Sequence, residues 1–539
     1  MRTRVALAVL ATVSSVALVG ADTYPRNPDI DIQHYTFKLT LTDASDDITG
    51  ETTIEVRVTR AGVSELAVDL IGQSAERAGK GMAVGAVKEG DAALEFRHMD
   101  NRLAIRLAKP SEAGERRRIT IAYRGVPADG LIISKNKHGE RTFFADNFPD
   151  RARHWLPTLD HPSDKATCEF VITAPDRYRA IATGLKIEES DLPDGGRLTH
   201  WRTAVPVSTY NMVMGVARFA VQYADRADGV SIETWAYPQD RDAWFRAFAV
   251  TRRIVDFYAF RVGPYAYEKL ANVQSRTRFG GMENAGNIFY SEKLGLERGA
   301  EGIAAHEIAH QWFGDAVTES DWNHAWLSEG FATYFTHLYH EFTYGRERLT
   351  DGIRRDRQSI AEYNRKNPDA RIVDPRVPVS RVLSTYTYDK GGWVLHMLRR
   401  KVGDEKFWAG IRAYYREYRD RSALTEDFRD VMEEASGVDL DAFFRQWVFE
   451  PGHPKLGAAW SYDSTRKSLS LTVDQTQDGK SFAFVLDLGL TFADGTRQVK
   501  TVEVGGKSET FTIPLDTAPV AVALDPDVWL LAEMEIVRR

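Results

Sequence analysis

Apolar and polar residues alternate through most of residues 22–221. Tyr35, Phe37, Leu39 and Leu41, for example, are separated by polar positions, and similar runs recur further along. A period of two places one face of a strand on a core and the other in solvent. Because Gly, Pro and Asp residues separate the runs, we predict an all-β N-terminal domain over residues 22–221, folded as a large sandwich or saddle.

The apolar spacing becomes helical from about residue 222. Trp244 and Phe248 are four positions apart, and the run continues until Gly263 and Pro264 interrupt it. Helical patterns then dominate to about residue 450. The sequence therefore predicts a second domain over residues 222–454, with its clearest helical patterns at 304–313, 327–340 and 392–401.

Strand-like alternation returns in the last part of the chain. Two prolines, Pro451 and Pro454, end the preceding helical pattern. Leu469, Leu471 and Val473 then alternate with polar residues. We predict a small C-terminal β-sandwich over residues 455–539.

The first 21 residues have the features of a secretory signal peptide. Arg2 and Arg4 precede an apolar run from residue 5 to residue 19, and small residues follow up to Ala21. We expect an exported protein, periplasmic or secreted; the alternative is a membrane anchor formed by the uncleaved segment. No other run approaches about twenty apolar residues, so we expect no stable membrane span after cleavage.

Composition describes an ordinary globular protein and excludes some partners. The chain has 539 residues, enough for three or four domains. Its formal net charge is −7, and cleavage after Ala21 removes two arginines and no acidic residue, which gives −9. A mildly acidic chain argues against nucleic acid as a partner. Cys168 is the only cysteine, which excludes an intrachain disulfide and a cysteine-rich zinc site.

His306, Glu307 and His310 form the motif His-Glu-x-x-His within a helical pattern. Residues four apart share one face of a helix, so the two imidazoles can bind one metal ion from consecutive turns. Glu307 lies off that axis, within reach of a water molecule beside the metal. Zinc suits such imidazole ligands, and we predict one Zn²⁺ per chain.

Glu329 is the candidate third metal ligand, because catalytic zinc usually takes three protein ligands and a water. Eighteen residues separate it from His310. That gap suits a helix end, a loop and the first turn of a second helix packed on the first. Taken alone, such a glutamate could be a surface carboxylate, but its sequence context favours a ligand.

A third element, after the His-Glu-x-x-His motif and Glu329, is the segment Gly280-Gly281-Met282-Glu283-Asn284, which precedes the two histidines. Together these motifs resemble the gluzincin zinc metallo-aminopeptidases, the family of aminopeptidase N and the leukotriene epoxide hydrolase, over most of residues 30–455. The resemblance implies a multidomain α+β protein whose second domain is a thermolysin-like mixed α/β zinc catalytic domain. We expect a short form without the large helical C-terminal domain that caps those relatives. Its cleft would then be open or covered by a second subunit of a homo-oligomer.

The resemblance also implies roles for individual residues. Glu307 would act as general base and Tyr388 would donate a hydrogen bond to the transition state. Glu283 would bind the free N-terminal ammonium of a peptide substrate. Relatives place a Gln or Glu beside that ammonium where this chain has Phe148; Asp146 and Asn147 are the neighbouring polar candidates. The substrate-binding segment would comprise Gly280, Gly281, Met282, Glu283 and Asn284.

The predicted function is hydrolysis of the N-terminal residue from peptides through a zinc-activated water. A zinc endopeptidase and a bifunctional epoxide hydrolase/aminopeptidase are the alternatives. A binding protein on an inactive peptidase scaffold would predict a broken motif. The residues of all three motifs are intact, which disfavours it.

Overall fold

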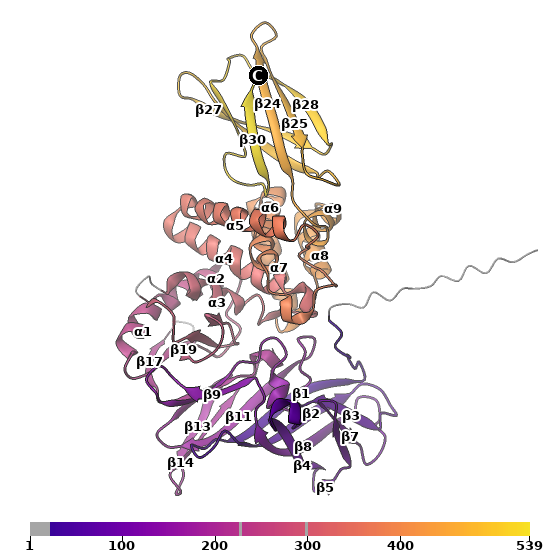
Figure 1. Cartoon of the computed structure of the whole chain (residues 1–539), viewed down its shortest axis with the longest axis vertical. Helices are drawn as coiled ribbons and strands as arrows, with labels where there is room; N and C mark the ends of the chain where they lie inside the picture. The colour runs from indigo at the N-terminus through magenta and orange to yellow at the C-terminus, as the bar shows by residue number, and fades with distance from the viewer. Residues whose placement is uncertain (1–21, 226–228, 297–299) are drawn as a thin grey trace, which may run out of the picture.

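The computed structural model describes residues 22–225, 229–296 and 300–539. Figure 1 shows three tiers along the long axis of the molecule: β-strands at one end, a mixed helical middle, and a second group of strands at the C-terminal end. The predicted fold class is confirmed. The predicted signal peptide, residues 1–21, lies outside the described residues. No helix in the described part of the chain is long and apolar enough to cross a membrane.

A nine-stranded sheet forms most of the N-terminal tier. Tyr35, Phe37 and Leu39 point into its core, as their alternation predicts. Neighbouring strands along its main path are β13 (Leu185–Asp191), β14 (Gly196–Arg202), β11 (Lys165–Pro175), β1 (Ile30–Thr40), β2 (Ile48–Val58), β8 (Arg116–Val126), β4 (Gly81–Glu89) and β5 (Ala92–Ala93), with β15 (Val207–Ser208) paired to β11.

Two smaller sheets complete this tier. The first of these sheets is formed by β12 (Arg179–Ala182), β16 (Met214–Ala217), β10 (Arg141–Ala145) and β9 (Leu131–Lys135). The second is formed by β3 (Glu65–Asp69), β7 (Arg102–Arg106) and β6 (Phe96–Met99). The loop that follows β10 of the first sheet holds Phe148, which reaches the cleft described below.

The middle tier begins with a five-stranded sheet. Its strand order is β17 (Ala220–Asp225), β18 (Ser231–Ala236), β19 (Lys269–Ser275), β21 (Asn287–Ser291) and β20 (Gly281–Met282). The three inner strands are parallel, and β20 is an antiparallel edge strand. The predicted boundary between residues 221 and 222 falls within β17.

Helices fill the rest of the middle tier. They are α1 (Arg241–Ala247), α2 (Thr251–Arg261), α3 (Glu301–His310), α4 (Trp326–Tyr344), α5 (Arg346–Lys366), α6 (Gly391–Val402), α7 (Asp404–Tyr418), α8 (Thr425–Ser436) and α9 (Asp441–Phe444). A short pair of strands, β22 (Val317–Glu319) and β23 (Arg421–Ala423), joins the loop after α3 to the end of α7.

The C-terminal tier has two sheets. One consists of β28 (Ser508–Pro514), β25 (Ser468–Gln475), β24 (Lys455–Asp463) and β30 (Glu533–Arg538), and the other of β27 (Arg497–Val504), β26 (Phe484–Thr491) and β29 (Ala521–Leu524). Leu469, Leu471 and Val473 of β25 are fully buried, as predicted. The tier packs on α6, where His396 stacks on Trp529 at 4.5 Å between ring centroids.

Candidate active site

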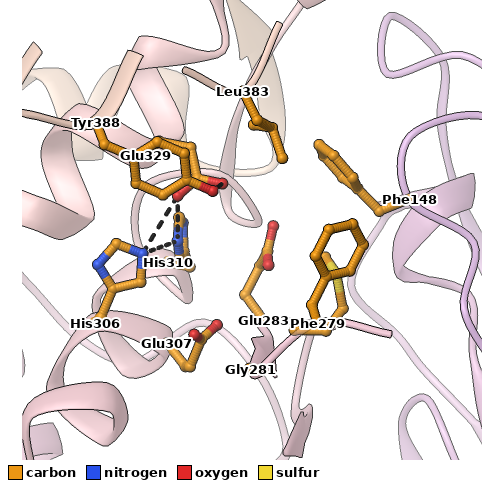
Figure 2. A pocket seen from close by; sticks show the side chains of 11 residues that line it. Phe148, Phe279, Gly281, Glu283, His306, Glu307, His310, Glu329, Leu383 and Tyr388 are labelled. Carbon is orange, nitrogen blue, oxygen red and sulfur yellow. Dashed lines mark hydrogen bonds and ion pairs between the residues drawn. The ribbon is translucent and has the colours of Figure 1, made fainter. Parts of the chain in front are cut away.

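Two helices bring together the three predicted metal ligands. His306 and His310 occupy consecutive turns of α3, and Glu329 lies in the first turn of α4. Oε2 of Glu329 is 3.3 Å from Nε2 of His306 and 3.2 Å from Nε2 of His310, and the two nitrogens are 3.2 Å apart (Figure 2). The three donor atoms therefore form a nearly equilateral triangle.

This triangle has the dimensions of a tetrahedral zinc site. Bonds of about 2.0–2.1 Å to nitrogen or oxygen place the corners of a tetrahedron about 3.3 Å apart. Two imidazoles and one carboxylate are also a donor set that zinc accepts, and they leave a fourth position for water or substrate. The residues present thus fit one zinc ion.

The charges of the site favour a bound cation. Burial acts to lower the pKa of His310, but the charges of Glu283 and Glu329 outweigh it and raise that pKa well above the ordinary value. Burial acts to raise the pKa of Glu329, but the charge of His310 and the hydrogen bonds of both histidines hold it below its usual range. Without metal, the carboxylates draw a proton onto His310, and a divalent cation would satisfy the same field.

The other ring nitrogen of His310 is held from two sides. Nδ1 lies 3.1 Å from the carbonyl oxygen of Phe313 and 2.9 Å from Oγ of Ser328. Such partners fix the orientation of a metal-binding imidazole and leave Nε2 to face the metal. Gly314 makes room for this arrangement: its φ is +120°, and a Cβ there would lie 2.3 Å from Oγ of Ser328.

Glu307 projects from α3 against the edge strand β20. A Cβ added to Gly281 would lie only 2.1 Å from Oε1 of Glu307, so the glycine is required for this close approach. Burial, above all, raises the pKa of Glu307 well above its ordinary value. A raised pKa makes the carboxylate a stronger base, which suits a group that accepts a proton and later returns it.

Glu283 lies directly after β20 and faces the same cavity (Figure 2). Its side chain is 4% exposed, and burial raises its pKa to about 7. Carboxylate oxygens of Glu283 and Glu307 and a nitrogen of His310 lie within 4.8 Å of one another. The backbone is held by Gln311, whose Nε2 donates to the Glu283 carbonyl at 2.5 Å.

Tyr388 lies on a single π-helical turn, Tyr386–Lys390, that leads into α6. Its hydroxyl donates to Oε1 of Glu329 at 2.8 Å, and its ring stacks on His306 at 6.0 Å between centroids. The turn reaches the site because α4 and α6 touch through glycines: a Cβ on Gly330 would lie 2.9 Å from the Gly391 backbone.

These groups line an open cavity with about 300 Å³ of empty space, part of which is continuous with solvent. On the side away from the histidines, its wall consists of apolar side chains from three separate segments. Phe148, Phe279 and Leu383 form this wall, which we call the apolar wall (Figure 2). Met282 also lines the cavity.

Two family models match this chain, one on each side of the β17 region. The peptidase M1 N-terminal domain matches residues 32–211, and the peptidase family M1 domain matches residues 246–447, which include all three candidate ligands. The chain belongs to peptidase family M1.

Known members of family M1 are similar over much of this chain. Glutamyl aminopeptidase of Mus musculus is 26% identical over 375 residues, 66% of this chain and 40% of its own length. Probable aminopeptidase 2 of Sulfurisphaera tokodaii is 26% identical, over 69% of this chain and 49% of its own. The chain thus spans about half or less of the length of these relatives.

A solved structure shows the same fold. A variant of the M1 zinc metallopeptidase of Deinococcus radiodurans superposes with a TM-score of 0.66 at 24% sequence identity. The match covers 80% of this chain and 97% of that one. The arrangement of the tiers is therefore that of an M1 zinc peptidase.

Not every residue of the predicted substrate-binding segment lines the cavity of this member of family M1. Gly281, Met282 and Glu283 do. Gly280 instead accepts a backbone hydrogen bond from Ser291, and Asn284 is buried beside the site without contributing to the cavity lining. The segment supplies three lining residues and two that support them.

Asp146 and Asn147 do not replace the amine-binding residue of the relatives. Oδ2 of Asp146 accepts the backbone N–H of Arg278, and Oδ1 of Asn147 accepts the indole N–H of Trp155. Both side chains serve the framework behind the cavity. Phe148, the next residue in the chain, lines the cavity, whereas Asp146 and Asn147 do not.

Ser328 is a site residue that the sequence reasoning missed. The local signal was its position one residue before Glu329, but its contact with His310 depends on how α3 and α4 pack. Two nearby acidic residues have other partners: Asp315 accepts from Gln311 and Asn211, and Glu292 accepts the backbone N–H of Lys137.

Proposed function

We propose that this chain is a zinc-dependent aminopeptidase that hydrolyses the N-terminal residue from peptides. The observation that carries the proposal is the buried carboxylate of Glu283 in the same cavity as the ligand triangle. It offers a charged partner for a substrate ammonium only a few ångströms from the reacting centre. An internal peptide segment would leave this carboxylate buried and unpaired, at a cost in free energy.

The metal ligands, Glu307 and Tyr388 have separate roles in the proposed hydrolysis. Zinc, when bound by His306, His310 and Glu329, supplies Lewis acidity and lowers the pKa of a coordinated water. Glu307 accepts a proton from the attacking water at its carboxylate and returns it to the leaving amine. The Tyr388 hydroxyl donates a hydrogen bond to the oxygen on which negative charge develops.

Glu283 sets where the peptide is cut. An ammonium paired with its carboxylate fixes the first residue of the substrate, so the first peptide bond meets the reacting groups. Gly281 and Met282, in the edge strand β20, run beside the cavity and are placed to pair with an extended substrate.

The test compares free and blocked N-termini. Purified, zinc-loaded protein is assayed with aminoacyl p-nitroanilides and with their N-acetylated forms, with and without a chelator. We expect cleavage of free-amine substrates alone, lost on chelation and restored by zinc. Equal cleavage of acetylated substrates would instead support an endopeptidase, and no cleavage of any free-amine substrate would overturn the proposal.

We also propose that the protein is exported and loses residues 1–21. The basic start and the apolar run of that segment support this proposal. N-terminal sequencing of protein from the periplasmic or culture fraction should start at Asp22. An intact N-terminus in a membrane fraction would favour the anchored alternative.

Light scattering on the same preparation tests the predicted homo-oligomer.

A further inference from the structure

Among the described lining residues, the three of the apolar wall have no role in the proposed chemistry. The ligand triangle, Glu307 and Tyr388 occupy one side, and Glu283 stands between them and the wall (Figure 2). A substrate with its ammonium on Glu283 and its first carbonyl at the ligand triangle has its α-carbon between the two. Its side chain then has space only toward Phe148, Phe279 and Leu383.

The wall is held rigidly by aromatic packing. The Phe148 ring makes edge contacts with Trp322 at 5.1 Å, Tyr210 at 5.6 Å and Phe279 at 6.1 Å between centroids. Phe148 itself is 6% exposed. These contacts preform an apolar surface, so little ordering is required when a side chain binds to it.

The two arginines described beside Phe279 are both paired with carboxylates. Arg151 lies with its guanidinium 6.0 Å from the centre of the Phe279 ring, but it is paired with Asp146 at 2.5 Å. Arg278 is likewise paired with Asp129 at 2.5 Å. No lysine or arginine occurs among the described residues that line the cavity, whereas three glutamates do.

We infer that this site selects peptides with an apolar N-terminal residue, of leucine, methionine or phenylalanine type, and rejects acidic ones. The inference rests on the proposed aminopeptidase function and names the substrate class of that site. An apolar side chain gains by leaving water for the wall. An acidic one would lose its hydration, find no lysine or arginine among the described lining residues and face the carboxylates already present. The relatives named glutamyl aminopeptidases carry a different specificity in their names.

The first test is a substrate panel at fixed pH and salt. Leucyl, phenylalanyl, alanyl, glutamyl and lysyl p-nitroanilides are compared by kcat/KM. One methylene in an apolar pocket changes kcat/KM by about 10- to 200-fold, so leucyl should exceed alanyl by at least about tenfold. We expect glutamyl to be poorer still. Glutamyl or lysyl cleaved as well as leucyl would overturn the inference and leave the proposed function intact; no cleavage of any member would overturn the proposed function.

The second test places a cation in the wall. Leu383 is partly exposed and lies in the loop before the π-helical turn, so Leu383→Arg perturbs little of the core. We expect the ratio of glutamyl to leucyl kcat/KM to rise by at least about tenfold, an effect of one favourable charge pair. Leu185→Arg, an exposed site on β13, is the matched control and should leave the ratio unchanged.

The third test uses a second wall variant, Phe279→Ala, which can be measured even if Leu383→Arg does not fold. Phe279→Ala removes apolar wall while leaving Glu283 and the ligand triangle. The ratio of phenylalanyl to alanyl kcat/KM should fall by at least about tenfold. An unchanged preference in either folded variant would show that the substrate side chain does not contact the wall.

Discussion

The hydroxyl of Tyr388 donates to Oε1 of Glu329 at 2.8 Å, while Oε2 of the same carboxylate faces both histidine nitrogens. One carboxylate therefore connects the donor proposed for the transition state to the metal ligands. In this resting arrangement the tyrosine orients Glu329. To donate to a substrate oxygen it must exchange one hydrogen bond for another, which costs little because both acceptors carry negative charge.

Tyr388→Phe should reduce kcat by about 10²- to 10³-fold with little change in KM, because the lost hydrogen bond forms only as charge develops. Tyr386→Phe is the matched control. The Tyr386 hydroxyl donates to Oδ1 of Asn364 at 2.8 Å, away from the cavity. The measurement is kcat and KM of both variants on one well-cleaved substrate. Equal losses of kcat in the two variants would contradict the proposed role of Tyr388 as a hydrogen-bond donor to the transition state.

Glu307→Gln should retain zinc and lose about 10²- to 10⁴-fold in kcat, because the amide keeps the shape and loses the basicity. Zinc content is measured by atomic emission alongside kcat. Glu301→Gln, at the start of the same helix, controls for a general effect on α3 and should stay near wild type. Full activity in Glu307→Gln would refute the assignment of the base.

Gly281→Ala should lower kcat by about 10²-fold with zinc retained, because its Cβ would lie 2.1 Å from Oε1 of Glu307 and displace the base. Gly280→Ala is its neighbour in sequence and a close control. There the nearest atom to the new Cβ is Cδ1 of Ile303 at 3.7 Å, an ordinary contact. If both alanines behave alike, the close approach to Glu307 does not govern the rate.

Ser328→Ala should weaken zinc binding by about 10- to 100-fold, because His310 loses one of the two groups that orient it. Competition with a chromogenic chelator measures the dissociation constant. Ser461→Ala on β24, in the C-terminal tier, should bind zinc as wild type does. An unchanged constant for Ser328→Ala would mean that the Phe313 carbonyl alone orients the imidazole.

Asp164→Asn should stabilise the protein, and more so as pH rises. Burial raises the pKa of Asp164 to about 8, against 3.8 for a free side chain. The folded state therefore holds a proton that the unfolded chain releases, and between about pH 4 and pH 8 raising the pH disfavours folding. The variant removes this penalty, worth about 2–4 °C in Tm for each kcal/mol.

Thermal melts at about pH 5 and pH 8 measure this effect. The gap between variant and wild type should widen at the higher pH. Asp463→Asn on β24, where the carboxylate is exposed to solvent, is the control and should show no such widening. A gap that narrows with pH would contradict the predicted direction.

Local patterns were enough to predict both the strands and the metal-binding motif. Alternation identified β1 and β25 because a strand with one buried face has a period of two. The helix itself places His306 and His310 four residues apart on one face, so their pairing needed no tertiary information. The spacing to Glu329 allowed a third ligand but did not identify one, and the family resemblance made that assignment.

Tertiary structure alone decided which other groups meet at the site. Ser328 reaches His310, and Tyr388 reaches Glu329, only because α3, α4 and α6 pack closely through glycines. The carboxylate of Asp315 accepts hydrogen bonds from Gln311 and Asn211, two residues that lie far apart in the sequence. Phe148, Phe279 and Leu383 come from segments far apart in the chain, so their common wall depends on long-range packing. The motif in the sequence determined the metal chemistry; the packing determined what shapes and surrounds it.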